Sequence, residues 1–238
     1  MRALVRLLVL LVVLGVVAVV ADRWAARAVE RAVATHLATA GGLDAPPEVE
    51  VRGTPFLTQA VRGRYDDVVV RAEGVQAGEL RVRQFVAQLR GVQVPLGEAL
   101  SGDVVAVPVD ALTARAVLSY ADLSQAVAER GLRLSPAGGG LVRVTGSVRV
   151  LGRDLEASAV SRPELVDGAV VVTAERFEVG NEVADAVLTR ALGDRLDVRL
   201  DIAALPYGLE LTSLRAGGDG IVLQARSDGA VLQPLPAS

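Results

Sequence analysis

The chain has 238 residues with 25 basic and 28 acidic side chains, and it is 51% hydrophobic but only 3% aromatic. Every basic residue is arginine, cysteine is absent and His36 is the single histidine. These facts exclude lysine Schiff-base chemistry, disulfides and thiolate metal sites, and they disfavour a catalytic triad, a histidine-rich zinc site and nucleic-acid binding.

The first two dozen residues predict a membrane segment. Residues 7–21 are uncharged, and with residues 3–5 beyond a snorkelling Arg6 they approach the roughly 20 residues that span a bilayer. We favour an uncleaved signal anchor over residues 1–21, because Asp22 opens directly into an amphipathic helix rather than a loop. A signal peptide cleaved after Ala21, which would release a secreted form, has the same outline.

Orientation depends on the charges that flank this segment. Arginines lie on both sides of the span, and Asp22 and Glu30 offset part of the charge that follows it. We therefore expect a single pass through the plasma membrane, with the N-terminus inside and the bulk of the chain extracytoplasmic.

Residues 22–40 predict an amphipathic helix that ends at the glycine pair 41–42. Its apolar stripe combines residues at helical spacing with three neighbours: Trp24, Ala28, Ala32, His36 and Ala40, with Val29, Val33 and Leu37. Trp24 fits a ring at headgroup level and a core side chain equally well. For His36, a packed or edge position on this stripe is favoured over catalysis.

Beyond residue 47 the apolar pattern changes to period 2, which predicts strands joined by glycine-containing hairpin turns. The clearest strands cover residues 49–51, 68–73, 80–89, 142–150 and 196–202. Three helices are predicted: 111–118 with Asp110 as N-cap, 122–130 with Asp122 and Gln125 as a capping pair, and 181–193. This order of elements predicts an α+β fold with antiparallel sheet, in one domain over residues 22–238.

No spacing of residues predicts an active site or a metal site. Asp66 and Asp67 are chain neighbours that would point to opposite faces of a strand, which disfavours shared-proton chemistry. Asp194, Asp197 and Asp201 could face a cation, but a solvated face that is compensated by arginine is favoured. We therefore expect no enzyme activity, no catalytic residues, no metal and no cofactor.

The aliphatic strand faces suit either an acyl-sized groove between sheet and helix or a solid core. Seven side chains are expected on this apolar wall: Val142, Val144, Val148, Val150, Leu196, Val198 and Leu200. Periodicity identifies the apolar face but leaves both alternatives open.

Residues 52–75 read RGTPFLTQAVRGRYDDVVVRAEGV, and residues 205–232 read LPYGLELTSLRAGGDGIVLQARSDGAVL. Over about residues 22–233 the chain resembles the LmeA-like phospholipid-binding family of envelope proteins from high-GC Gram-positive bacteria, long known only as a domain of unknown function. The resemblance implies a TULIP-like lipid-carrier half-barrel, in which a long curved antiparallel sheet packs around helices. At motif positions, Gly53, Pro55 and Gly63 would set turns, while Phe56 and Leu57 would be apolar anchors for lipid.

These features lead us to expect a membrane-anchored, non-catalytic phospholipid-binding protein that serves cell-envelope lipid or lipoglycan maintenance. Its partners would be phospholipid or lipoglycan acyl chains and the plasma membrane. The alternative is a scaffold with a solid core that holds an envelope enzyme as its partner. An enzyme ranks last.

Overall fold

The computed structural model describes residues 2–41, 43, 45–77, 80–101, 104–150, 153–166, 169–172, 176–179, 182–183, 198–201 and 205–233. The chain divides into two compact units. The first comprises Met1–Ala72, Ala87–Leu112 and Asp228–Ser238, and the second comprises Glu73–Val86 and Thr113–Ser227. The single domain expected from residue 22 onward stays a prediction.

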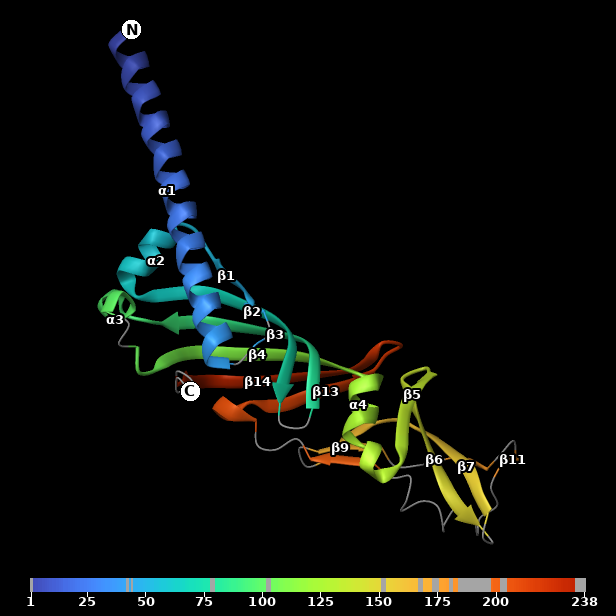
Figure 1. The fold of residues 1–238 in the computed structure, drawn as a ribbon. Helices are drawn as coiled ribbons and strands as arrows, with labels where there is room; N and C mark the ends of the chain where they lie inside the picture. The colour runs from blue at the N-terminus through green and yellow to red at the C-terminus, as the bar shows by residue number, and fades with distance from the viewer. Residues whose placement is uncertain are drawn as a thin grey trace. The chain divides into compact units, whose positions relative to one another are not determined.

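The largest sheet has six strands in the order β1-β2-β3-β4-β14-β13 (Figure 1). These strands are β1 (Glu48–Arg52), β2 (Arg64–Ala77), β3 (Leu80–Gln93), β4 (Val107–Ser119), β13 (Glu210–Ala216) and β14 (Gly220–Leu232). β1 pairs antiparallel with β2, and β13 pairs antiparallel with β14. The sheet is open, with β1 and β13 at its edges. The predicted α+β fold with a large antiparallel sheet is confirmed.

Three helices belong to the first unit: α1 (Arg2–Gly41), α2 (Phe56–Arg62) and α3 (Leu96–Ser101). α1 contacts β1 and α2, and α2 contacts α3. Val49, Val51 and Val69 are buried in this unit together with Phe56, whose ring centroid lies 6.0 Å from that of Tyr65. The core of the first unit therefore forms where α1 and α2 meet the first two strands.

The second unit contains the shorter elements: α4 (Tyr120–Ala126), η1 (Ala128–Arg130), β5 (Leu132–Gly138), β6 (Leu141–Val150), β7 (Arg153–Ser161), β8 (Glu164–Val166), β9 (Ala169–Val172), β10 (Arg176–Val179), β11 (Glu182–Val183), β12 (Val198–Asp201) and η2 (Pro206–Gly208). A five-stranded sheet has the order β11-β10-β7-β6-β5, and a three-stranded sheet has the order β12-β9-β8. Their pairs are antiparallel. α4 packs on β5, and its Leu123 is almost wholly buried.

The C-terminal half of α1 confirms the helix predicted over residues 22–40, but the predicted apolar face is wrong. Six side chains of the predicted stripe are exposed: Trp24, Ala28, Val29, Ala32, Val33 and His36. For Trp24 and His36, exposure fits the headgroup and edge alternatives. The buried positions, Asp22, Ala26 and Ala34, are centred about a third of a turn away from the middle of this stripe. Small alanines let the backbone of α1 approach its neighbours closely, and Asp22 is buried because its carboxylate is hydrogen bonded.

The helix predicted over residues 111–118 is wrong, because these residues belong to β4. Leu112, Ala114 and Leu118 are buried at alternating positions, and β4 lies between β3 and β14 in the sheet. Pairing on both edges satisfies the backbone of a segment whose composition also suits a helix, so the tertiary partners decide the outcome.

The helix predicted over residues 122–130 is confirmed in outline. It begins earlier, since Ser119 is the N-cap of α4, and it ends as predicted at Gly131, which adopts a left-handed conformation with φ of 70°. At residues 181–193 the structure describes only Glu182–Val183, which form β11 rather than helix, and the rest lies outside the described residues. The helices α2 and α3 were not predicted.

Candidate functional site

The expected lipid-binding residues are distributed over both units. Phe56 is buried in α2 of the first unit, whereas its neighbour Leu57 is 45% exposed. In the second unit, Val142 and Val144 of β6 are 0% and 1% exposed. The structure describes only the backbone of Val148 and Val150 in β6 and of Val198 and Leu200 in β12. Leu196 lies outside the described residues. Their role in lipid binding stays a prediction.

Val142 and Val144 face a closely packed aliphatic cluster within the second unit. Leu123 and Val127, from α4 and the residue after it, and Ala157 and Ala159 of β7 belong to the same cluster. The β6 and β7 members are paired across the sheet, with Val144 opposite Ala159. At this position the described side chains fill the space between helix and sheet, as in the solid-core alternative.

α4 is held on this cluster by polar contacts at its ends. Ser119 accepts a hydrogen bond from the backbone N–H of Asp122 at 3.1 Å, and the Ser119 hydroxyl also contacts the Asp122 carboxylate. The Tyr120 hydroxyl donates to the carbonyl of Gly217 at 2.9 Å, and burial raises the pKa of this phenol. Ser124 accepts a hydrogen bond from the backbone N–H of Leu134 in β5.

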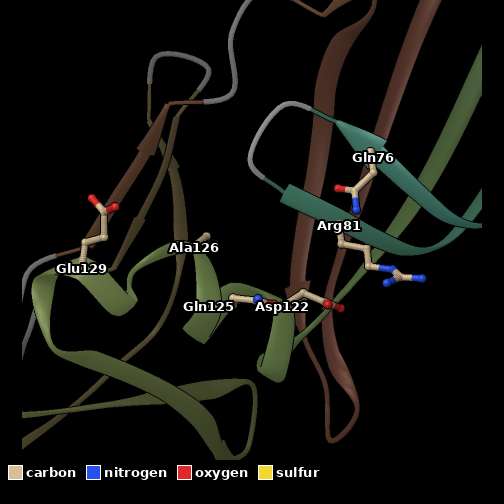
Figure 2. Close-up of a pocket in the computed structure, with 6 residues that line it drawn as sticks. All are labelled: Gln76, Arg81, Asp122, Gln125, Ala126 and Glu129. Atoms are coloured by element: carbon tan, nitrogen blue, oxygen red, sulfur yellow. The ribbon is translucent and has the colours of Figure 1, made fainter. Parts of the chain in front are cut away.

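A pocket of about 360 Å³ lies beside α4, wholly within the second unit (Figure 2). Gln76 and Arg81 come from the β2 and β3 strands, Asp122, Gln125 and Ala126 from α4, and Glu129 from η1. Figure 2 shows Asp122 and Gln125 on α4 near Arg81, with Glu129 apart from them. Gly74 makes room for the arginine, because a Cβ atom there would lie 3.1 Å from the Arg81 guanidinium.

The chemistry of this pocket is polar. It combines one guanidinium, two carboxylates and two amides, so its formal charge is −1. Such a lining offers hydrogen bonds to hydroxyl groups and one cation to a phosphate, but it offers no apolar wall to an acyl chain. The pocket therefore suits a polar group and is distinct from the expected apolar wall.

A second group of polar contacts joins α1 to the segment that carries the first sequence motif. Asp22 accepts a hydrogen bond from the backbone N–H of Leu57 at 2.8 Å. This bond caps α2 from outside, because the N-cap residue Pro55 provides no side-chain cap. Arg23 donates to the carbonyl of Gly53 at 3.2 Å.

Further along α1, Glu30 accepts a hydrogen bond from the backbone N–H of Val51 at 2.9 Å. Together with Asp22 and Arg23, it binds three backbone groups of the β1–α2 segment. The residue that directly follows the uncharged run is thus tied to the first turn of α2.

Gln59 organises the turn between β1 and α2. Its amide nitrogen donates to the carbonyl of Arg52 at 3.3 Å, and its amide oxygen accepts from the backbone N–H of Asp66 at 2.9 Å. Gly53 has φ of 99°, and a Cβ atom there would lie 2.7 Å from the Gln59 amide nitrogen. The turn-setting role expected for Gly53 therefore has a physical basis, which is contact with Gln59.

Sequence reasoning missed Gln59, the capping role of Asp22 and the polar pocket. The sequence does carry signals for the two helices involved. Pro55 directly before an apolar run marks the start of α2, and Ser119 three residues before Asp122 matches a capping box at the start of α4. Asp22 offered no local signal, because the N–H group that it caps lies 35 residues further along the chain.

Several acidic residues in the described ranges take part in ion pairs and hydrogen bonds. Glu50 lies 3.0 Å from Arg52 and 3.2 Å from Arg71. The hydrogen bond from Arg52, aided by Arg71 and opposed by desolvation, holds the pKa of Glu50 below its ordinary value. Asp67 accepts from the Gln88 side chain at 2.9 Å.

No group of three or more metal-ligating side chains occurs within the described residues. Of the three aspartates considered for a cation site, Asp194 and Asp197 lie outside those residues, and only the backbone of Asp201 is described. The absence of a metal and of a cofactor stays a prediction. His36 is exposed on α1, as the edge alternative predicts.

α1 contains a candidate membrane span. The stretch Arg6–Thr39 has a window with a mean hydropathy of 2.4, of which 6% is buried. A signal sequence near an N-terminus meets the same criteria of length and composition. The predicted apolar N-terminal helix is confirmed, and its cleavage and orientation remain predictions.

Comparison with known proteins identifies a family. The family described as LmeA-like phospholipid-binding matches residues 20–226, which is most of the chain. No curated protein and no solved structure matches the chain. The matched range begins near the end of the uncharged run and includes both the α1–α2 contacts and the polar pocket.

Proposed function

Since this chain belongs to the LmeA-like phospholipid-binding family, we propose that it is a non-catalytic phospholipid-binding protein, anchored on the outer side of the plasma membrane, that serves envelope lipid or lipoglycan maintenance. The family match over residues 20–226 is the observation that carries this proposal. The family is a lipid-binding one, and no acid, base or nucleophile constellation stands out among the described residues.

The apolar helix α1 supports the anchor. Its exposed side chains from Leu7 to Val20 are aliphatic, and exposed aliphatic surface of this extent is stable against lipid tails rather than water. Asp22 and Arg23, which follow directly, bind the folded chain instead of leading into a linker. An uncleaved anchor would therefore hold the first unit at the bilayer surface.

In the second unit, acyl chains would lie between sheet and helices, against the seven predicted wall residues. In the first unit, Phe56 and Leu57 would be separate apolar anchors. Each buried CH₂ group contributes on the order of 0.8 kcal/mol, so two acyl chains are held without covalent chemistry. In the second unit the side chains of Val142 and Val144 are already covered, so a lipid there must displace part of the cluster.

Photo-crosslinking tests the proposal. The full chain, in its native membrane, would be exposed to a diacyl phospholipid with a photoreactive group near the end of an acyl chain. Peptides would then be mapped by mass spectrometry. We expect crosslinks in β6 and β12 in addition to those in the anchor. Crosslinks restricted to residues 2–21 would contradict a lipid site in the folded part.

The scaffold alternative has one specific observation in its favour, the close packing of Val142 and Val144. Substitution Val144→Phe distinguishes the two functions. A lipid site would lose crosslinking in β6 because the larger side chain occupies it. A solid core would instead lose stability by overpacking, about 1–3 kcal/mol, while crosslinking in β6 is absent from the start.

A further inference from the structure

The short helix α2 presents an apolar side to solvent. Phe56, Gln59 and Ala60 are buried on one side of it, whereas Leu57 and Val61, one helical turn apart, are 45% and 74% exposed on the other. Trp24 of α1, the sole tryptophan of the chain, is 72% exposed. Water is a poor environment for these three side chains.

The location of these side chains follows from the contacts of α2 with α1. The uncharged run ends at Ala21, and the next residue, Asp22, accepts the hydrogen bond from the backbone N–H of Leu57. A helix rises about 1.5 Å per residue, so Trp24 lies about 4.5 Å along the axis from Ala21. The headgroup layer on each side of a bilayer is about 5–7 Å thick.

Figure 1 shows α2 beside α1, on the side of β2 from which the N-terminal half of α1 projects. Arg27 on α1 and Arg62 in the last turn of α2 are exposed on the same two helices. Apolar side chains flanked by arginine fit a layer where acyl chains meet anionic phosphates. A tryptophan at this depth is typical of a membrane interface.

We propose that α2 and Trp24 insert into the headgroup layer of the phospholipid bilayer, so that the first unit makes a second membrane contact beside the anchor. This proposal rests on the anchor in the proposed function. A bilayer is the favoured occupant because the uncharged run that precedes Asp22 brings the first turn of α2 to headgroup depth. A binding site for a protein partner would not need to lie at headgroup depth.

The composition of the chain permits a direct test. The full chain has no cysteine, so Val61→Cys carries a single nitroxide label, and Trp24 is the single tryptophan fluorophore. The protein would be reconstituted in vesicles of phosphatidylcholine and phosphatidylglycerol. Val231→Cys is the matched control, because Val231 is a 55% exposed valine on β14 of the same unit.

We expect the Val61 label to collide more often with oxygen, which concentrates in lipid, than with a water-soluble nickel complex, and the Val231 label to show the reverse. Brominated lipids should quench Trp24 fluorescence. Equal ratios of oxygen to nickel-complex collisions at the two labels would overturn the proposal. A Val61 label that is immobilised without an excess of oxygen collisions would also overturn it, because such a label indicates a protein partner.

Failure of the anchor itself has a different signature. Release of the protein from the vesicles at alkaline pH would contradict the anchor. In contrast, a retained protein with a water-exposed Val61 label would contradict only the second contact. Circular dichroism of the labelled variants confirms that each one is folded.

Discussion

At the scale of single residues, Gly53 shows why the first motif contains a glycine. Its φ of 99° disfavours any other residue, and a Cβ atom would lie 2.7 Å from the Gln59 amide nitrogen. We expect Gly53→Ala to lower the free energy of unfolding by about 1–3 kcal/mol, because it adds backbone strain and disturbs the Gln59 hydrogen bonds. Denaturant unfolding of the full chain in detergent micelles measures this loss.

Gly97→Ala is the matched control for Gly53→Ala. Gly97 lies in α3, and no atom is within 4 Å of the Cβ that the substitution would add. Alanine is the better helix former, so a gain of up to about 1 kcal/mol is expected. Equal losses for the two variants would show that contact with Gln59 is not the cause.

The lowered pKa of Glu50 predicts that its contact between β1 and β2 is sensitive to acid. Arg52 and Arg71 lower its pKa, so the folded state holds this proton more weakly than the unfolded state does. The resulting stability is present above the ordinary glutamate pKa near 4.5 and is lost as the pH falls through the lowered value. The effect is small, since solvent screens a partly exposed pair.

Melting temperatures measured between neutral and acidic pH test this contact. Glu50→Gln should melt at a lower temperature than the parent at neutral pH and converge with it in acid. Glu164→Gln, at an exposed glutamate of β8, provides the comparison. If the melting temperatures of the parent and of Glu50→Gln differed by the same amount at every pH, the charge of Glu50 would be ruled out as the source of the stability difference.

At the scale of elements, the stability of the first turn of α4 depends on the hydroxyl group of Ser119. Ser119 caps the helix and contacts Asp122, which also lines the polar pocket. We expect Ser119→Ala to destabilise the protein by about 1 kcal/mol, because an N–H group of the first turn loses its partner. Ser119→Thr keeps the hydroxyl and should unfold close to the parent in the same denaturant titration.

The elements also show where local patterns mislead. Residues 110–118 suit either a helix or a strand, and pairing of β4 with β3 and β14 makes them a strand. In α1 the helical period was predicted correctly and the buried face was not, because both faces of the helix are rich in alanine and valine. The side that carries Asp22 and Glu30 is covered, since these two carboxylates hydrogen bond to backbone N–H groups of the first unit.

At the scale of the whole molecule, α1 predicts integral membrane behaviour. If residues 2–21 are retained, the native protein should stay in the membrane fraction after an alkaline carbonate wash, and its intact mass should be that of the full 24.7 kDa chain. A soluble product that lacks residues 1–21 would show cleavage after Ala21. It would then favour a form that is free to carry lipid.

Local chemistry in the sequence determined the apolar N-terminal helix, the α+β class and several hairpins. An uncharged run and glycine turns act within a few residues. For example, Gly138 at the end of β5 and Gly139 and Gly140, which connect it to β6, all have positive φ. The motif at residues 52–75 also identified the family, because a motif is read residue by residue.

Only the tertiary structure decided which face of α1 is covered, that residues 110–118 form a strand, and that Asp22 caps α2 across 35 residues. It also brought Gln76 and Arg81 together with Asp122 and Glu129 around a polar pocket. Periodicity records which side chains are apolar. Burial and capping depend on partners that are distant in the chain, so they are set by the packing of the fold.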